Sequence, residues 1–315
     1  MNKPYCFITN DVETTSLVYH QLRDETGKLV LSQGMPRLLD LFDELNIKTT
    51  FFYTGYIAER FPDVVKIAHQ RGHEVASHGY SHLVKNAFDV MPNEKIKEHL
   101  FKSKDILEQI TGEEVISFRA PALRIKKNFT PYLLDAGFKI DSSVASQRMD
   151  MIMSFGSKHK LNWLLSPRSP YFASEKNIFS KGNSELLEIP VTSILVPYIG
   201  TVMRISPLLL KSLRPFIILE KNLFNRHVNF LSHPNEFIDE VQDESIRIQK
   251  RSKNPISYVL ADVLRYRLKI KNLGEKAMPL YRNELMFLQQ NGYDFHRMKD
   301  VYANFKLKHA SKRSS

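Results

Sequence analysis

The chain has 315 residues, 43% of them hydrophobic, which supports a sizeable apolar core and argues against wholesale disorder. The single cysteine, Cys6, excludes an internal disulfide framework and a cysteine-rich zinc site, and we expect it to be a core thiol. The formal net charge of +11 indicates an anionic partner, or simply high solubility, without naming the partner.

No apolar stretch reaches the length of a membrane span, and MNKPYCFITNDVE leads into a strand-like run without a secretory signal. We therefore expect a cytoplasmic location. Basic residues gather late in the chain, in IRIQKRSKN, RYRLKIKN and KLKHASKRSS. No nucleic-acid recognition motif accompanies them, so nucleic acid is not an expected partner. Residues 303–315 are expected to form a disordered basic tail.

Strand-like and helix-like patterns alternate in the first half of the chain. Residues 5–9 form a short apolar run, 35–47 have apolar residues at helical spacing, and 48–55 are β-branched and aromatic. There follow a helix that ends at Gly72, a strand over HEVASH, a helix that ends at Gly112, a strand over VISFRAP, a helix over FTPYLLDAGF and a strand over KIDSSV. This order is typical of an α/β protein with parallel strands joined by right-handed crossovers.

The alternation breaks at residues 146–184, where we expect a long excursion over the catalytic face. Strand patterns return at 186–192 and 227–233, and 279–291 is expected to be the last amphipathic helix. The segment SPLLLKSLRPFIILE is apolar with two basic residues. Packing against the barrel is the favoured interpretation, and a membrane-interface helix is the alternative, which Pro215 would interrupt.

Polar residues follow successive strand-like runs. They are Asp11, Glu13, His78, His82, Arg119, Asp141, Glu188 and His233. The carboxyl ends of parallel strands share one face of a barrel, and active sites form on that face. The positions of these residues therefore predict one shared site without relying on any single motif.

The stretch GHEVASHGYSH places His78 and His82 four residues apart, on one face of a helix or across a turn. Imidazole binds zinc, iron, cobalt and nickel, and a catalytic zinc needs about three protein ligands and an open position. Asp11 or Glu13 would supply the third ligand. Histidines at this spacing are more often only hydrogen-bonded in a polar turn, and we expect that role for His73.

GHEVASHGYSH resembles the second motif of the polysaccharide deacetylases, the carbohydrate esterase family that includes chitooligosaccharide and peptidoglycan deacetylases. TNDVE resembles the first motif and SFRAPALR the third, and IDSSV, LLEIPVT and FLSHPNEF follow in the family's order. The resemblance implies a distorted (β/α)7-type barrel over residues 1–302. It also implies hydrolysis of an N-acetyl group of an amino sugar at a divalent metal, with zinc expected and cobalt or nickel as alternatives.

By this resemblance His78 and His82 are metal ligands and Asp11 is the general base. The sequence departs from the family at Val12, where a second aspartate is usual. Glu13 is therefore our candidate for the third ligand. Asp11 as the ligand, and a site without metal, are the alternatives.

His233 resembles the general acid of the fifth motif, which protonates the leaving amine. Arg119 resembles the third-motif arginine that orients the base. Glu188 or Asp141 is expected to orient His233, and the sequence does not rank them. Ala122 replaces an aromatic residue of the family, and its backbone N–H is expected to help hold the oxyanion.

Substrate recognition is expected from the excursion, which carries Arg148, Trp163, Arg168 and Tyr171. We expect a lipid-linked or nucleotide-linked amino sugar of envelope polysaccharide or lipopolysaccharide synthesis, handled by a protein peripheral on the inner face of the membrane. The competing interpretations are a metal-free amidohydrolase or deformylase of the same fold and an inactive sugar-binding protein.

Overall fold

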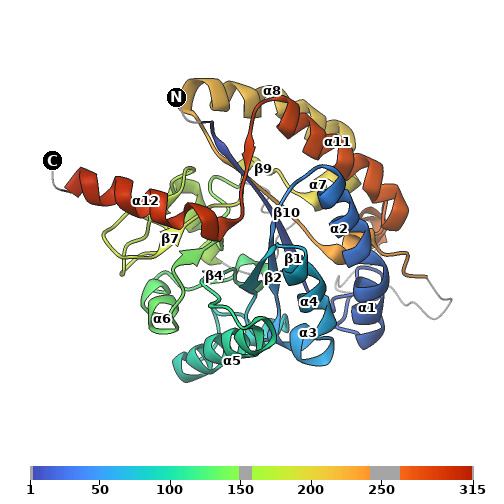
Figure 1. Ribbon diagram of the computed structural model, residues 1–315, viewed down its shortest axis with the longest axis horizontal. Coiled ribbons are helices and arrows are strands. Elements are labelled where there is room, and N and C mark those ends of the chain that lie inside the picture. Colours follow the sequence, from blue (N-terminus) through green and yellow to red (C-terminus); the bar gives the residue numbers. More distant parts are fainter. Residues whose placement is uncertain (1–2, 149–157, 242–262, 314–315) are drawn as a thin grey trace.

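A curled, mostly parallel sheet forms the centre of the molecule (Figure 1). The structure is a computed structural model that describes residues 3–148, 158–241 and 263–313. Within these residues, the parallel strands in spatial order are β10 (Val228–Ser232), β1 (Tyr5–Val12), β2 (Thr50–Tyr53), β3 (Glu74–Ser77), β4 (Ser117–Phe118), β5 (Ile140–Asp141) and β7 (Leu187–Glu188). The predicted distorted (β/α)7-type barrel is confirmed.

The two edges of the barrel meet through residues 192–199, which include the hairpin strands β8 (Ser193–Ile194) and β9 (Val196–Pro197). The Thr192 N–H donates to the Asn229 carbonyl at 3.0 Å, and the Asn229 N–H donates to the Thr192 hydroxyl at 2.8 Å. Ile199 forms a parallel bridge with Leu231 on β10. Hydrogen bonds across this seam therefore hold the curled sheet together.

Helices connect the strands and cover the outer side of the sheet (Figure 1). They are α1 (Asp24–Leu29), α2 (Met35–Glu44), α3 (Gly55–Arg60), α4 (Asp63–Gln70), α5 (Asn93–Thr111), α6 (Thr130–Asp135), α7 (Gly200–Ile205), α8 (Pro207–Phe224), α10 (Leu264–Lys269), α11 (Ala277–Gln290) and α12 (Met298–Arg313). As expected, α5 stops before Gly112, whose φ of 69° suits the end of a helix. None of the described helices is both long and apolar enough to span a bilayer.

Side-chain alternation along β1 separates the barrel interior from the outer core. Cys6, Ile8 and Val12 belong to the larger apolar cluster, whereas Phe7 belongs to a second cluster with residues of β2 to β7. Because alternate residues of a strand share a face, Asp11 lies on the side of Phe7 and Val12 on the other side. Val12 is thus a core residue, and so is Cys6, as predicted.

The excursion is more than a loop, because β6 (Tyr171–Phe172) within it pairs antiparallel with β7. The excursion, which showed no clear period in the sequence, thus contains this strand and the 3₁₀ segment Lys158–Leu165. Residues 149–157 of the excursion, and the basic stretch at 246–254, lie outside the described part of the chain. Pro215 does not interrupt α8, whose Leu210, Leu213 and Ile217 are buried. The favoured packing against the barrel is confirmed.

The predicted disordered tail was wrong for residues 303–313, which continue α12 beyond the edge of the sheet (Figure 1). The reason lies at the start of the helix. Glu74 is buried in the barrel and accepts the Lys299 N–H at 2.9 Å, while Thr50 accepts the Met298 N–H at 3.0 Å. A carboxyl group that accepts N–H groups of the first turn stabilises a helix start.

Replacing Glu74 with alanine is expected to lower the free energy of unfolding by about 2–4 kcal/mol. The change leaves the Lys299 N–H and the Thr50 and Ser117 hydroxyls without their acceptor. Chemical denaturation would measure the loss. Glu185→Ala is the matched control, because this exposed carboxylate also contacts α12, through Lys306, and should matter little. Equal stability of the two variants would contradict the prediction.

Candidate active site

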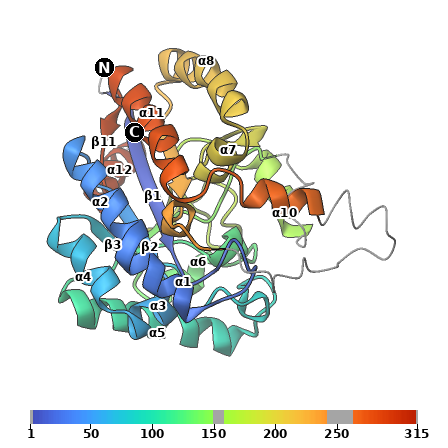
Figure 2. The ribbon, with the colours of Figure 1, turned by 90° about the vertical axis from the view of Figure 1, so that its right-hand side faces the viewer.

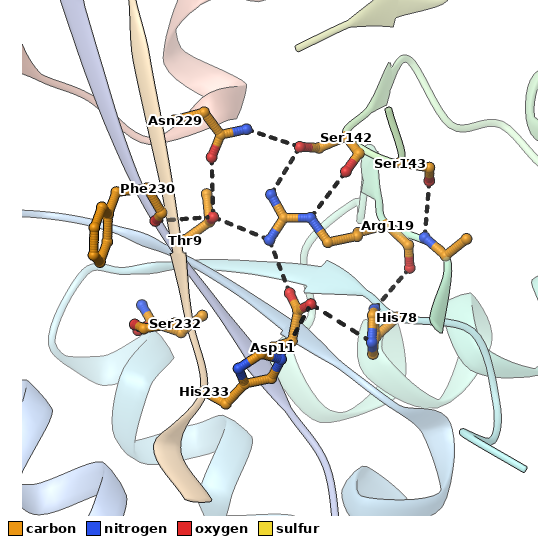
Figure 3. A network of polar contacts seen from close by, with 12 residues as sticks. Thr9, Asp11, His78, Arg119, Ser142, Ser143, Asn229, Phe230, Ser232 and His233 are labelled. Carbon is orange, nitrogen blue, oxygen red and sulfur yellow. Dashed lines mark hydrogen bonds and ion pairs between the residues drawn. The ribbon is translucent and has the colours of Figure 1, made fainter. Parts of the chain in front are cut away.

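Asp11 and Arg119 form the buried centre of the candidate site (Figure 3). Asp11 lies on the inner side of β1, one residue before the strand ends, and its Oδ1 accepts a hydrogen bond from Arg119 Nη1 at 2.8 Å. The fully buried Arg119 also donates to the Thr9 hydroxyl, and to the carbonyl and hydroxyl of Ser142. With so many bonds the guanidinium has one orientation, and it fixes the Asp11 carboxylate as the sequence suggested.

The surroundings of Asp11 keep its carboxylate charged. Burial alone would raise the pKa of Asp11, but the positive charge of Arg119, with smaller contributions from His78 and His233, holds it below the ordinary value. The free Oδ2 faces His78 Nε2 at 3.7 Å and His233 Nε2 at 4.0 Å. Asp11 is therefore ionised and stands between the two imidazoles.

His78 is held in the form that a metal ligand needs. Its Nδ1 lies 2.8 Å from the Arg119 carbonyl oxygen, and because a carbonyl only accepts, Nδ1 carries the proton. The lone pair of Nε2 then faces the site. Burial lowers the pKa of His78 to about 4, so the ring is neutral at neutral pH.

Glu13, His78 and His82 come together at the ends of β1 and β3. One ligand atom from each lies within 4.8 Å of the other two. His82 Nε2 is 3.4 Å from Glu13 Oε2, which also accepts a hydrogen bond from the Thr15 hydroxyl at 2.9 Å. Two imidazole nitrogens and one carboxylate oxygen fit a catalytic zinc, cobalt or nickel ion.

Strand geometry explains why Glu13, and not Val12, lies beside the two histidines. Residues 11 and 13 share the inner side of β1, whereas Val12 is buried in the outer core. His73 takes no part in this cluster. Its Nδ1 accepts the Thr49 N–H at 3.1 Å, and burial lowers its pKa to about 4, so it is the structural histidine that we expected.

His233 lies across Asp11 from the candidate metal ligands, after β10. Within the described residues, the carboxylates within 4.0 Å of its ring are those of Asp11 and Glu236. Burial alone would lower the pKa of His233, but the Glu236 carboxylate 3.9 Å from its Nδ1, and then the charges of Asp11 and Glu13, raise it to about 9. The ring is therefore protonated at neutral pH, as a general acid must be.

Glu236 was missed by the sequence reasoning. Its carboxylate is buried and accepts hydrogen bonds from the Thr201 hydroxyl at 2.7 Å and from Arg204 Nη2 at 3.1 Å. Against the cost of burial, the charges of Arg204 and His233 lower the pKa of Glu236 to about 2. The sequence HPNE held a signal, because a glutamate three residues after a helix-capping position often turns back on it.

Arg204 anchors this arrangement and was also missed. It is 1% exposed, and its Nη1 donates to the carbonyls of Lys269 and Lys271 at 3.0 and 2.7 Å. The Asn272 side chain donates to the Arg204 carbonyl at 2.8 Å. The end of α10 therefore fixes Arg204, which fixes Glu236 beside His233.

Asp141 and Glu188 do not orient His233, so this expectation was wrong. The two buried carboxyl groups interact with each other, and burial, with the neighbouring charge of Asp141, raises the pKa of Glu188 well above its ordinary value. Asp141 Oδ1 accepts the Ser143 hydroxyl at 2.6 Å, and that hydroxyl accepts the Ala120 N–H at 2.9 Å. The pair therefore braces the strand ends next to Arg119.

Ala122 and Leu123, which follow β4, both have left-handed backbone angles, with φ of 53° and 55°. A non-glycine residue in this conformation lowers the stability of the folded protein by on the order of 1 kcal/mol. Such residues are often found at functional sites. The role of the Ala122 N–H in holding an oxyanion stays a prediction.

Three side chains of the excursion that were expected to bind substrate, those of Trp163, Arg168 and Tyr171, are engaged within the protein. Trp163 is 2% exposed, and the Tyr171 hydroxyl donates to the Ile178 carbonyl at 2.7 Å. Arg168 makes a two-fold ion pair with Glu220 and donates to the Ser193 carbonyl at 2.9 Å. These residue types suit packing as well as binding, and here they hold the excursion against the barrel.

Residues 22–140 match the sequence profile of a family described as polysaccharide deacetylase. This segment of the chain belongs to the polysaccharide deacetylase family. The profile covers His78, His82 and Arg119. Asp11, Glu13 and His233 lie outside it, and their place in the site rests on the distances between side chains in the structure.

Two curated relatives are similar over part of this chain. A peptidoglycan deacetylase of Helicobacter pylori is 34% identical over 111 residues, which are 35% of this chain and 37% of that protein. A peptidoglycan-N-acetylglucosamine deacetylase of Bacillus cereus is 32% identical over 105 residues, 33% and 37% of the two chains. The chain therefore matches little more than a third of the length of these relatives.

The fold likeness is more extensive than the sequence likeness. A putative polysaccharide deacetylase from Mycobacterium smegmatis superposes over 98% of this chain and 92% of its own, with a TM-score of 0.62 and 16% identity. At this identity the likeness shows the fold alone, including the second half of the chain that the family profile does not reach.

Replacing Glu236 with glutamine is expected to lower the turnover number about tenfold, with little change in KM, if His233 donates the proton. Glu236 raises the pKa of His233, so its loss lowers that pKa toward the ordinary value, about 6.5. Because a general acid acts only below its pKa, the alkaline limit of activity should move to lower pH. Asp239→Asn is the control, because Asp239 is an exposed carboxylate of the same segment. An unmoved pH profile would contradict the assignment.

Proposed function

We propose that this protein is a metal-dependent hydrolase that removes an N-acetyl group from an amino sugar. The observation that carries the proposal is the meeting of Glu13, His78 and His82 beside an ionised Asp11 and a protonated His233. A metal site flanked by a base and an acid is what amide hydrolysis requires. The names of the two curated relatives, both deacetylases of peptidoglycan, support the same reaction class.

Glu13, His78 and His82 would hold the metal, for which we propose zinc, with cobalt or nickel as alternatives. When bound, the metal would polarise the amide carbonyl and lower the pKa of water. Asp11 accepts the proton of the attacking water at its free Oδ2. Arg119 keeps this carboxylate ionised and aimed through its bond to Oδ1.

His233 supplies the second proton transfer. Its Nε2 faces Asp11 and the site, while its Nδ1 faces Glu236. The imidazolium donates its proton from Nε2 to the departing amine, which without that proton is a poor leaving group. Glu236, held by Arg204, keeps the ring oriented and favours its protonated form between turnovers.

For the substrate we propose an amino sugar of a glycan or glycolipid precursor, lipid-linked or nucleotide-linked, in envelope polysaccharide or lipopolysaccharide synthesis. The net charge of +11 supports an anionic substrate or surface. With it we propose a cytoplasmic location, peripheral on the inner face of the membrane. Fractionation of cells tests the location, and recovery in the soluble fraction regardless of salt would contradict membrane contact.

The reaction is tested by incubating the protein with N-acetylated chitooligosaccharides, peptidoglycan fragments and nucleotide-linked N-acetylglucosamine. We expect free acetate and free amine in equal amounts from at least one of them, lost after chelation and restored by zinc. Turnover that survives chelation would favour the metal-free amidohydrolase. Binding of a sugar without release of acetate would favour the inactive sugar-binding protein.

A further inference from the structure

We propose that the outer face of α8 docks on the surface of a bilayer that contains anionic phospholipids. This inference gives the membrane contact of the proposed function a defined surface, but it does not depend on the deacetylase reaction. Figure 2 shows α8 on the outside of the molecule, next to α7 and α11.

Helix α8 is apolar on two opposite sides. Its inner side buries Leu210, Leu213 and Ile217 against the barrel. Its outer side presents large apolar side chains to solvent, Leu208 at 79%, Phe216 at 53%, Leu219 at 52% and Leu223 at 63% exposure. Their spacing of eight, three and four residues places these four on one face of a helix. We call them the α8 stripe.

A groove runs beside the α8 stripe, between α8 and α11, with a volume of about 610 Å³. Ile218, Leu219 and Phe287 line it with apolar surface, and Lys211 and Arg214 stand on its wall. Apolar surface next to cations matches the acyl chain and the phosphate of a phospholipid. An exposed apolar helix face with cations at its edge is also the pattern of interfacial helices.

Charge favours a lipid surface over a second copy of the chain. Among the described basic residues of α8, Lys211 and Lys221 have no carboxylate partner, whereas Arg214 pairs with Glu284 of α11 and the one acid of the helix, Glu220, pairs with Arg168. The cations that count are therefore Lys211 and Lys221. A symmetric dimer would bring the same face of two copies together and place these cations against each other. Anionic headgroups would instead neutralise them, at about fivefold in affinity for each cation near the surface.

The stripe lies close to the candidate active site along the chain. Helix α7 holds Thr201 and Arg204, which both bind Glu236, and α8 begins after Ser206. Leu208, the first residue of the stripe, follows Arg204 by four positions. Membrane contact at α8 would therefore involve a helix that follows directly on the segment that orients His233.

Sedimentation with vesicles tests this proposal. We expect the protein to bind vesicles of phosphatidylglycerol and phosphatidylcholine, and to bind phosphatidylcholine alone much more weakly. Joint replacement of Phe216 and Leu219 by serine should weaken binding at least about tenfold. Lys211→Gln should weaken it about fivefold. Leu307→Ser is the matched control, because Leu307 on α12 is 71% exposed and outside the stripe, and it should bind as the unchanged protein does.

Absence of binding, or equal binding by all variants, would overturn the proposal. So would light scattering that shows a dimer dissolved by the Phe216 and Leu219 replacement, because a second copy would then cover the stripe. Release of acetate from soluble substrate should be equal in the unchanged protein and in this variant. The vesicle experiment and the activity assay can therefore contradict the membrane proposal and the deacetylase proposal independently of each other.

Discussion

Changing Asp11 to asparagine is expected to reduce the turnover number by about a hundredfold to ten-thousandfold, because the proton acceptor is lost. The asparagine side chain has nearly the same shape as aspartate, and its oxygen can still accept the hydrogen bond of Arg119 Nη1. The amide cannot take a proton from water at neutral pH. Steady-state release of acetate measures the effect, with metal content determined on the same samples.

Asp24→Asn is the control for this change, because Asp24 pairs with Arg60 on the outside of the molecule. Its turnover should match that of the unchanged protein. If Asp11→Asn kept the metal and kept full turnover, the assignment of Asp11 as base would be wrong. If it lost the metal, Asp11 would be a ligand, which is the alternative that the sequence left open.

Removal of a metal ligand is the second change with a large expected effect. His78→Ala and Glu13→Ala should each reduce the metal content from about one ion per chain to a small fraction of that. Turnover should fall with it, since two remaining ligands leave the ion weakly held. Elemental analysis of the purified proteins provides the measurement.

His69→Ala supplies the control for these two variants, because His69 lies on α4, outside the Glu13, His78 and His82 cluster. It should retain the metal. If His78→Ala lost the metal and Glu13→Ala kept it, the third ligand would be a group other than Glu13. If the purified protein contained no metal and still released acetate, the metal-free amidohydrolase would be the better interpretation.

The sequence predicted the parts of the site that follow from strand order. Polar residues after successive strands meet at one end of a parallel barrel, which is why Asp11, His78, Arg119 and His233 could be brought together without coordinates. Glu13 was favoured over Val12 by the resemblance to the family and because valine cannot bind a metal, and alternation along β1 is the structural reason that it lies beside the histidines. The meeting of the four residues depends only on local periodicity and topology.

The partner of His233 depended on packing that the sequence does not display. Asp141 and Glu188 follow strands as the catalytic residues do, yet they pair with each other. Glu236 is fixed by Arg204, which is 32 positions away and is itself held by the carbonyls of Lys269 and Lys271. Contacts of this kind are set by how helices dock, so residue spacing did not rank Asp141 against Glu188, and the capping pattern in HPNE was the sequence signal for Glu236.

The same limitation explains the errors in the second half of the chain. The basic C-terminal segment looked too polar to fold. Its helix α12 is nevertheless stabilised at its first turn by the buried Glu74, which accepts the N–H of Lys299, 225 positions away. Trp163 and Arg168 looked like substrate ligands, because the residue types that bind sugars and phosphates also serve for packing and ion pairs. Tertiary partners decided both cases.

The central claim is that Glu13, His78 and His82 hold a metal ion beside Asp11 and His233. Anomalous X-ray diffraction at the zinc edge, from crystals grown with zinc, tests it most directly. We expect one strong peak within bonding distance of all three side chains, about 2.0–2.2 Å from each ligand atom. A peak bound by Asp11 without Glu13, or the lack of any peak at this site, would contradict it.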